Sequence, residues 1–120
     1  MRAPRFGRHL PIERDGATLY VAADDIIAIH ANAHYTQIFD GRDQLFCPLA
    51  IGEVDSRLDT SRFARVHRSH IVNLDRIVAL KRAGDSGAVD LPDRSTVPVS
   101  RSRLGWLKAR LNRSIGEAVS

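Results

Sequence analysis

Arginine and histidine side chains gather in one segment of the chain, RFARVHRSHIVNLDRI, which spans residues 62–77. Its Arg65, His67, Arg68 and His70 alternate with apolar residues too closely for an ordinary solvated face. A guanidinium group donates two parallel hydrogen bonds to a guanine base or to a phosphate. The segment therefore combines side chains that can bind nucleic acid with apolar side chains that must be buried. We expect Arg65 and His67 to have structural roles.

The apolar residues of this segment are buried if the chain turns back on itself. We expect a short strand over residues 64–67, a tight turn or single helical turn through Ser69, and a return to strand at Arg76. Asn73 should hold this turn through backbone hydrogen bonds. Arg68 then lies near the apex and points outward. An arginine on a packed turn has already lost much of its rotamer freedom, which makes Arg68 the first candidate for reading a base.

A second candidate site lies where the last helix is expected to begin. Ser100 is a good N-cap residue, but Arg101 and Arg103 place cations in the first turn. The helix dipole disfavours each of them by about 0.3 to 1 kcal/mol, and local rules tend to be broken at functional sites. Free backbone N–H groups beside arginines suit a phosphate oxygen. The alternative is that both arginines simply lie on a solvated surface.

The elements that must position these residues are short. Asp-Gly pairs at residues 15–16 and 40–41 are typical of hairpin turns, and Pro98 favours an edge strand. Alternating and apolar runs predict strands at residues 9–14, 17–22, 26–31, 35–39, 44–47, 76–82, 88–91 and 96–99. Helical periodicity appears over residues 49–58 and again from Ser100, before a tail with no clear structure. The fold class is therefore β-dominated, mainly β with two short helices.

Length and composition indicate one globular domain of 120 residues, 43% hydrophobic and 27% charged. We expect a leader or linker remnant at 1–8, the domain at 9–113 and a tail at 114–120. The single cysteine, Cys47, excludes an internal disulfide and fits a reducing, cytoplasmic compartment. The sequence has neither an apolar run long enough to span a membrane nor a signal-peptide pattern.

Positive charge is concentrated in the second half of the chain. Residues 61–120 carry a balance of +7 and residues 1–60 a balance of −3, which together give the net charge of +4. Such an asymmetry favours an anionic partner. Nucleic acid is the first choice, and an acidic protein or a lipid surface is the alternative for a non-enzymatic interaction module.

Three separated motifs resemble the LytTR-type DNA-binding domains. They are the R-V-H-R-S core with its following V-N, the earlier stretch DDIIAIHANAHYTQIF, and the closing stretch VPVSRSRLGWLKARL. The resemblance covers roughly residues 9–112. It implies short antiparallel strands packed in small sheets, with loops rather than a recognition helix entering successive grooves of double-stranded DNA. It also implies the output domain of a bacterial transcriptional regulator, which is fused in some members to a sensor module.

The same resemblance assigns roles to individual residues. Arg68 would read a base in the major groove, His34 in the loop NAHYT would contact DNA, and Arg101 would reach DNA from the V-S-R motif. With Ser100 and Arg103 these residues form the expected DNA-binding set. Family members often occupy paired repeats, so two protomers on one DNA site, a homodimer on DNA, are expected. The resemblance calls for no cofactor.

An enzyme is the main rival class, and the sequence offers little for it. It has no G-x-S-x-G motif and no glycine-rich phosphate loop. Four histidines could suggest a metal site, but His30 and His34 lie at strand-and-loop spacing, about 13 Å apart if extended. We therefore expect neither catalysis nor a metal.

Overall fold

An N-terminal hairpin opens the described part of the chain. The computed structural model describes the backbone of residues 9–119 and side chains as far as Arg113, so the expected leader at residues 1–8 lies outside it. Strands β1 (His9–Arg14) and β2 (Ala17–Ala22) pair antiparallel. Asp15 and Gly16 both have positive φ angles, 53° and 78°, as a two-residue hairpin turn of right-handed twist requires. The Asp-Gly signal therefore predicted this hairpin correctly.

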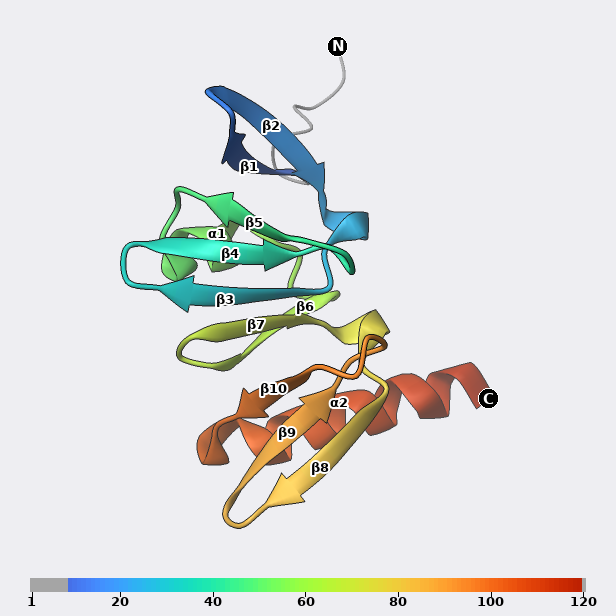
Figure 1. Cartoon of the computed structure of the whole chain (residues 1–120). Helices are drawn as coiled ribbons and strands as arrows, with labels where there is room; N and C mark the ends of the chain where they lie inside the picture. The colour runs from blue at the N-terminus through green and yellow to red at the C-terminus, as the bar shows by residue number, and fades with distance from the viewer. Residues whose placement is uncertain (1–8, 120) are drawn as a thin grey trace.

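A five-stranded antiparallel sheet forms the centre of the molecule, in the order β5-β4-β3-β7-β6 (Figure 1). Its strands are β3 (Ala28–Asn32), β4 (Tyr35–Phe39), β5 (Gln44–Cys47), β6 (Phe63–His67) and β7 (His70–Asn73). Helix α1 (Ile51–Arg57) carries the chain from β5 to β6. The predicted return to strand at Arg76 was wrong. The chain returns at His70, and Leu74–Arg76 forms a single turn of 3-10 helix after β7.

A second, three-stranded sheet follows in the order β10-β9-β8. Its strands are β8 (Ala79–Ala83), β9 (Ser86–Asp90) and β10 (Thr96–Val99), and helix α2 (Arg101–Val119) packs against it. Pro98 lies in β10 at the edge of this sheet, as predicted. Helix α2 runs to Val119, so the residues expected to form an unstructured tail continue the helix.

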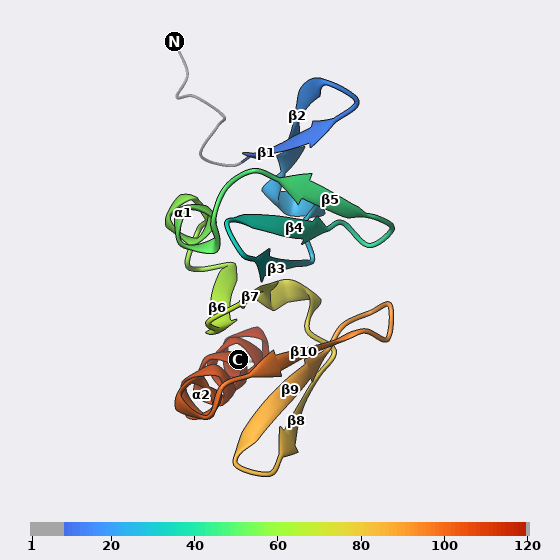
Figure 2. The same cartoon turned by 60° about the vertical axis from the view of Figure 1, so that its left-hand side comes forward.

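Buried apolar side chains form one cluster on each face of the five-stranded sheet. The first joins β1 and α1 to the sheet, and its members include Leu10, Ile29 and Val54. The second joins β9, β10 and α2 to the opposite face, and its members include Val72 and Leu107. Figure 2 shows the sheet between the N-terminal hairpin and α2. Burial on both faces fixes the strand register, because a shift by one residue would exchange the two sets.

Candidate nucleic-acid interface

Three chain connections lie along one edge of the molecule, one above another at the left of Figure 1. They are the turn at residues 33–34 between β3 and β4, the turn at residues 68–69 between β6 and β7, and the junction at residues 100–101 between β10 and α2. We call these residues the contact edge. All the connections that the sequence proposed for DNA contact therefore lie on the same side.

Two backbone hydrogen bonds hold the contact edge together. The Ala31 N–H donates to the Ser69 carbonyl at 2.8 Å, which ties β3, the strand that leads into the first connection, to the second. The Ser100 N–H donates to the Val66 carbonyl at 2.9 Å, which ties the third connection to β6, the strand that leads into the second. Because backbone groups make these bonds, the spacing of the three connections does not depend on side-chain rotamers.

The turn at residues 68–69 is braced from two directions. The Arg65 guanidinium donates to the Arg68 carbonyl at 2.6 Å. The Ser69 N–H donates to Nδ1 of His67 at 3.1 Å. Arg65 and His67 therefore have the structural roles that the sequence predicted, whereas the Arg68 side chain is exposed. A rigid turn presents this guanidinium with little further loss of conformational entropy on binding.

His34 lies at the end of the neighbouring turn. Ala33 adopts a positive φ of 58°, which closes the two-residue connection between β3 and β4. The His34 side chain is exposed, so its ring is available beside the Arg68 turn.

The start of α2 holds three of the predicted site residues, and two arginines there behave differently. Arg101 is exposed, whereas Arg103 is partly buried. The Nε of Arg103 donates to the Arg65 carbonyl at 3.1 Å, and its guanidinium lies 4.0 Å from the ring centre of Trp106. These contacts offset the unfavourable helix dipole. Arg103 thus fastens α2 to β6, and Ser100 accepts the helix's first backbone hydrogen bonds through its carbonyl.

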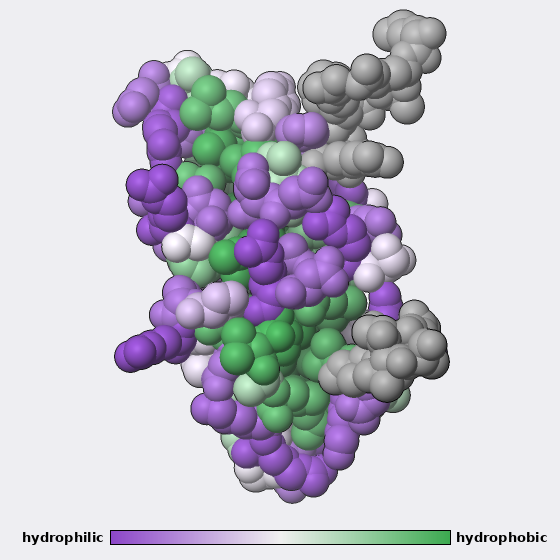
Figure 3. Space-filling model, turned by 90° about the vertical axis from the view of Figure 1, so that its right-hand side faces the viewer, coloured by the Kyte–Doolittle hydropathy of each residue, from purple (hydrophilic) through white to green (hydrophobic). Residues whose placement is uncertain are grey.

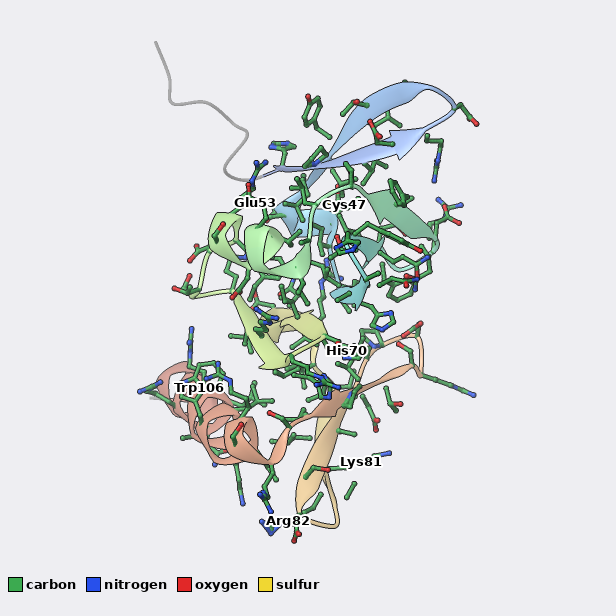
Figure 4. The ribbon with its side chains drawn as sticks, turned by 90° about the vertical axis from the view of Figure 1, so that its left-hand side faces the viewer. Cys47, Glu53, His70, Lys81, Arg82 and Trp106 are labelled. Carbon is green, nitrogen blue, oxygen red and sulfur yellow. The ribbon has the colours of Figure 1, made fainter. Side chains whose placement is uncertain are left out.

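Three histidines form a row that the sequence did not predict. His67, His70 and His30 are cross-strand neighbours on β6, β7 and β3. The rings of His30 and His70 are stacked at 4.6 Å, and those of His67 and His70 meet edge to face at 5.2 Å. Figure 4, which faces the contact edge, labels His70 at β7, where the five-stranded sheet lies next to the three-stranded sheet. Within the described residues no group of three His, Cys, Asp or Glu side chains is placed to hold a metal ion.

His70 should make the fold sensitive to acid. Burial, followed by the nearby His30 and His67, lowers the pKa of His70 from 6.5 to about 4. The unfolded chain therefore binds more protons between these values, and stability falls as the pH drops from about 6.5 to about 4. Since one pKa unit corresponds to about 1.4 kcal/mol and the site is only partly enclosed, we expect a loss of about 1 to 2 kcal/mol. Urea unfolding at a series of pH values measures it.

Replacing His70 with an aromatic residue that does not titrate provides the control for that measurement. His70→Phe keeps an aromatic side chain at this position and should flatten the profile between pH 6.5 and 4. The exposed His34→Ala should follow the wild-type profile. An unchanged slope in His70→Phe would assign the acid sensitivity to other groups.

Comparison with known proteins identifies the arrangement. The family model described as the LytTr DNA-binding domain matches residues 16–112. The heme-containing CO-sensing transcriptional regulators RcoM 1 and RcoM 2 of Paraburkholderia xenovorans are each 35% identical over 111 residues, covering 91% of this chain and 42% of theirs. The CO-responsive transcriptional regulator RcoM of Rhodospirillum rubrum is 32% identical over 110 residues. This match covers 90% of this chain and 47% of the relative's length. The chain thus spans less than half the length of these relatives.

A solved structure shows the same fold. The LytTr DNA-binding domain from Bacillus cereus superimposes with a TM-score of 0.77 at 20% identity, over 87% of this chain and 96% of that one. The predicted class of short antiparallel strands in small sheets is therefore confirmed. In the described part of the chain, no helix has the length and apolar character needed to cross a membrane.

Proposed function

The chain belongs to the LytTR family of DNA-binding domains, and from this membership we propose that it binds double-stranded DNA sequence-specifically by inserting the contact edge into successive grooves. The observation that carries the proposal is the hydrogen bonding of residues 31, 66, 69 and 100, which holds three connections in one rigid edge. Loops on a rigid scaffold are a common means of presenting binding residues. No catalytic step is required of this surface.

The exposed side chains of the contact edge have different roles in DNA binding. Arg68 stands on a braced turn, so a bidentate contact from its guanidinium to O6 and N7 of a guanine supplies base discrimination. Arg101 lies in the first turn of α2, where helix N–H groups and a cation together favour a phosphate oxygen. His34 contacts the DNA from the adjacent turn. Phosphate contacts position the domain and base contacts specify the site.

Ser100 and Arg103 belong to the same interface in a supporting role. Ser100 joins β10 to α2, and its N–H and carbonyl both make backbone hydrogen bonds. Arg103 is held by the Arg65 carbonyl and by Trp106. Both residues therefore set the position of Arg101 relative to Arg68. Because of this supporting role we include them in the proposed DNA interface.

The longer relatives suggest how the domain is used. They are transcriptional regulators named for CO sensing or CO response, and this chain matches less than half of each. We propose that the domain is the DNA-binding output part of a bacterial regulator with a separate sensor module, acting in the cytoplasm. Two protomers on paired repeats would double the number of contacts, and effective concentration then raises the affinity.

Selection from a random duplex pool tests this function. The domain is incubated with the pool at two salt concentrations, bound duplexes are sequenced, and a parallel selection without protein gives the background. We expect enrichment of a short motif, present as a repeat, and a log–log slope of affinity against salt of about −0.9 for each phosphate neutralised. Binding that enriches nothing and disappears with salt would overturn the proposal and favour an acidic protein or lipid partner.

A further inference from the structure

An open groove lies between β8 and α2, and of its lining residues only Arg101 belongs to the contact edge. Its volume is about 680 Å³, and its floor is apolar, with Leu74, Ile77 and Leu80 on one side and Leu104 and Leu111 on the other. These side chains pack at the margin of the second buried cluster and are only partly covered. The apolar area in the lower half of Figure 3 marks this region. Apolar surface of this kind within a polar rim is typical of an interaction site.

The rim of the groove is positively charged. Lys81, Arg82, Arg101 and Lys108 line it, against a single carboxylate, that of Asp85. Lys81 is paired with Asp90 at 2.7 Å, on the neighbouring strand. Among the described side chains no ion pair engages the remaining three cations, and all three are exposed. The occupant that complements this rim is therefore acidic.

The groove has a basic end and an apolar end. Gly87, the register partner of Arg82, lies against Leu104, since a Cβ on Gly87 would come within 2.6 Å of Leu104 Cδ1. The end of β8 therefore faces the beginning of α2, which brings Arg82 to the side of Arg101. Figure 1 shows the two elements running in opposite directions. The opposite end of the groove is lined by Ile77 and Leu111.

We propose that this groove docks an acidic amphipathic helix of a partner protein. The lining part of α2, residues 101–112, is about 18 Å long, which matches about three turns of a second helix. Apolar side chains at i, i+3 or i+4, and i+7 of that helix would lie on the leucine floor. Its carboxylates would face Arg82, Lys108 and Arg101. An open groove of this length suits a helix better than a small ligand, which normally is enclosed on most sides.

Arg101 links this groove to the contact edge. It lines the groove and also carries a phosphate contact in the proposed function, on which this step rests. A helix that engages the Arg101 guanidinium competes with DNA for the same group, so each should weaken binding of the other by the same factor. Docking itself does not require DNA.

A designed helix is the probe for docking. It is a capped 14-residue peptide with leucines at i, i+3, i+7 and i+10 and glutamates on the remaining face, titrated into the ¹⁵N-labelled domain without DNA. We expect saturable chemical-shift changes confined to residues of β8 and α2 that line the groove. The same peptide with lysine in place of glutamate, and one with the leucines out of phase, should bind at least about tenfold more weakly.

Charge reversal in the domain supplies the matched test. Arg82→Glu combined with Lys108→Glu alters two exposed side chains, and an unchanged amide spectrum elsewhere verifies the fold. This variant should lose about tenfold in affinity for the acidic peptide and gain affinity for the basic one. Equal binding of both peptides by the wild-type domain, shifts outside the groove, or no binding would overturn the proposal.

Other occupants would give different results. Concentration-dependent shifts in the groove without peptide would indicate a second copy of the chain. Broadening of groove signals by phosphatidylglycerol vesicles, with no response to the peptide, would indicate a lipid surface. Either result overturns the helix proposal. A final titration of selected duplex into the peptide complex tests the link through Arg101. Equal affinity for the duplex with and without peptide would remove that link. Failure of the peptide-free domain to bind DNA would remove the proposed function, whereas docking would stand on the DNA-free titration.

Discussion

Replacing Arg68 with alanine is expected to weaken binding to the selected duplex about 30- to 100-fold, while binding to unrelated duplex changes by less than about threefold. A bidentate contact from arginine to guanine carries about 1 to 3 kcal/mol of discrimination, and the rigid turn places Arg68 at the upper part of this range. The side chain is exposed, and its carbonyl, which alanine retains, accepts the bond from Arg65. The substitution therefore leaves the scaffold intact. Fluorescence anisotropy with both duplexes measures the two affinities.

Two further variants separate base reading from charge. Arg68→Lys keeps the cation but loses the forked donor pair, so it should recover nonspecific affinity and little of the discrimination. Arg42→Ala removes an exposed arginine from the turn between β4 and β5. This turn lies at the end of β4 that points away from the contact edge. It should bind the selected duplex like the wild type. An equal loss on every sequence in Arg68→Ala would show that Arg68 contacts phosphate rather than a base.

The hairpins, helix α1 and the beginning of α2 were predictable because their signals are local. Asp15-Gly16 and Asp40-Gly41 fix turns through positive φ at glycine, and Pro98 marks an edge strand. The sheet order β5-β4-β3-β7-β6 is not local, because α1 carries β6 to the far side of β7. The convergence of residues 34, 68 and 101 depends on that order, so only the family resemblance could place these residues on one surface.

In the segment of residues 62–77, long-range strand pairing overrides the local sequence signals. Its sequence places turn-forming residues at Asn73 and Asp75, which suggested a late return to strand at Arg76. In the structure β7 begins at His70, because β3 supplies a partner strand through the pairs His30 with His70 and Ala28 with Val72. The histidine row follows from the same long-range pairing. The support of Arg103 is also a long-range contact, because the Arg65 carbonyl that accepts its hydrogen bond lies 38 residues away in sequence.

Replacing Asn73 with alanine is expected to destabilise the fold by about 3 kcal/mol. The Asn73 side chain is buried; its Nδ2 donates to the Ile26 carbonyl at 2.9 Å, and its Oδ1 accepts from the Asp75 N–H at 3.0 Å. Alanine leaves both partners without these bonds. Each unsatisfied buried group costs about 1 to 3 kcal/mol, and the Asp75 group, nearer the surface, can recover part of this from water. Urea unfolding, with coincident fluorescence and circular dichroism transitions, measures the change.

Two controls test whether Asn73 contributes to stability and not to DNA recognition. They are the stability of Asn32→Ala and the DNA binding of Asn73→Ala. Asn32 is exposed at the end of β3, so its replacement should change stability by less than about 0.5 kcal/mol. Asn73→Ala should retain wild-type discrimination between selected and unrelated duplex at a temperature where it is fully folded, because Asn73 ties β7 to the segment before β3 and does not lie on the contact edge. Arg68→Ala should show the reverse, full stability with lost discrimination. A variant of Asn73 that stays within about 1 kcal/mol of wild type would mean that water replaces both hydrogen bonds.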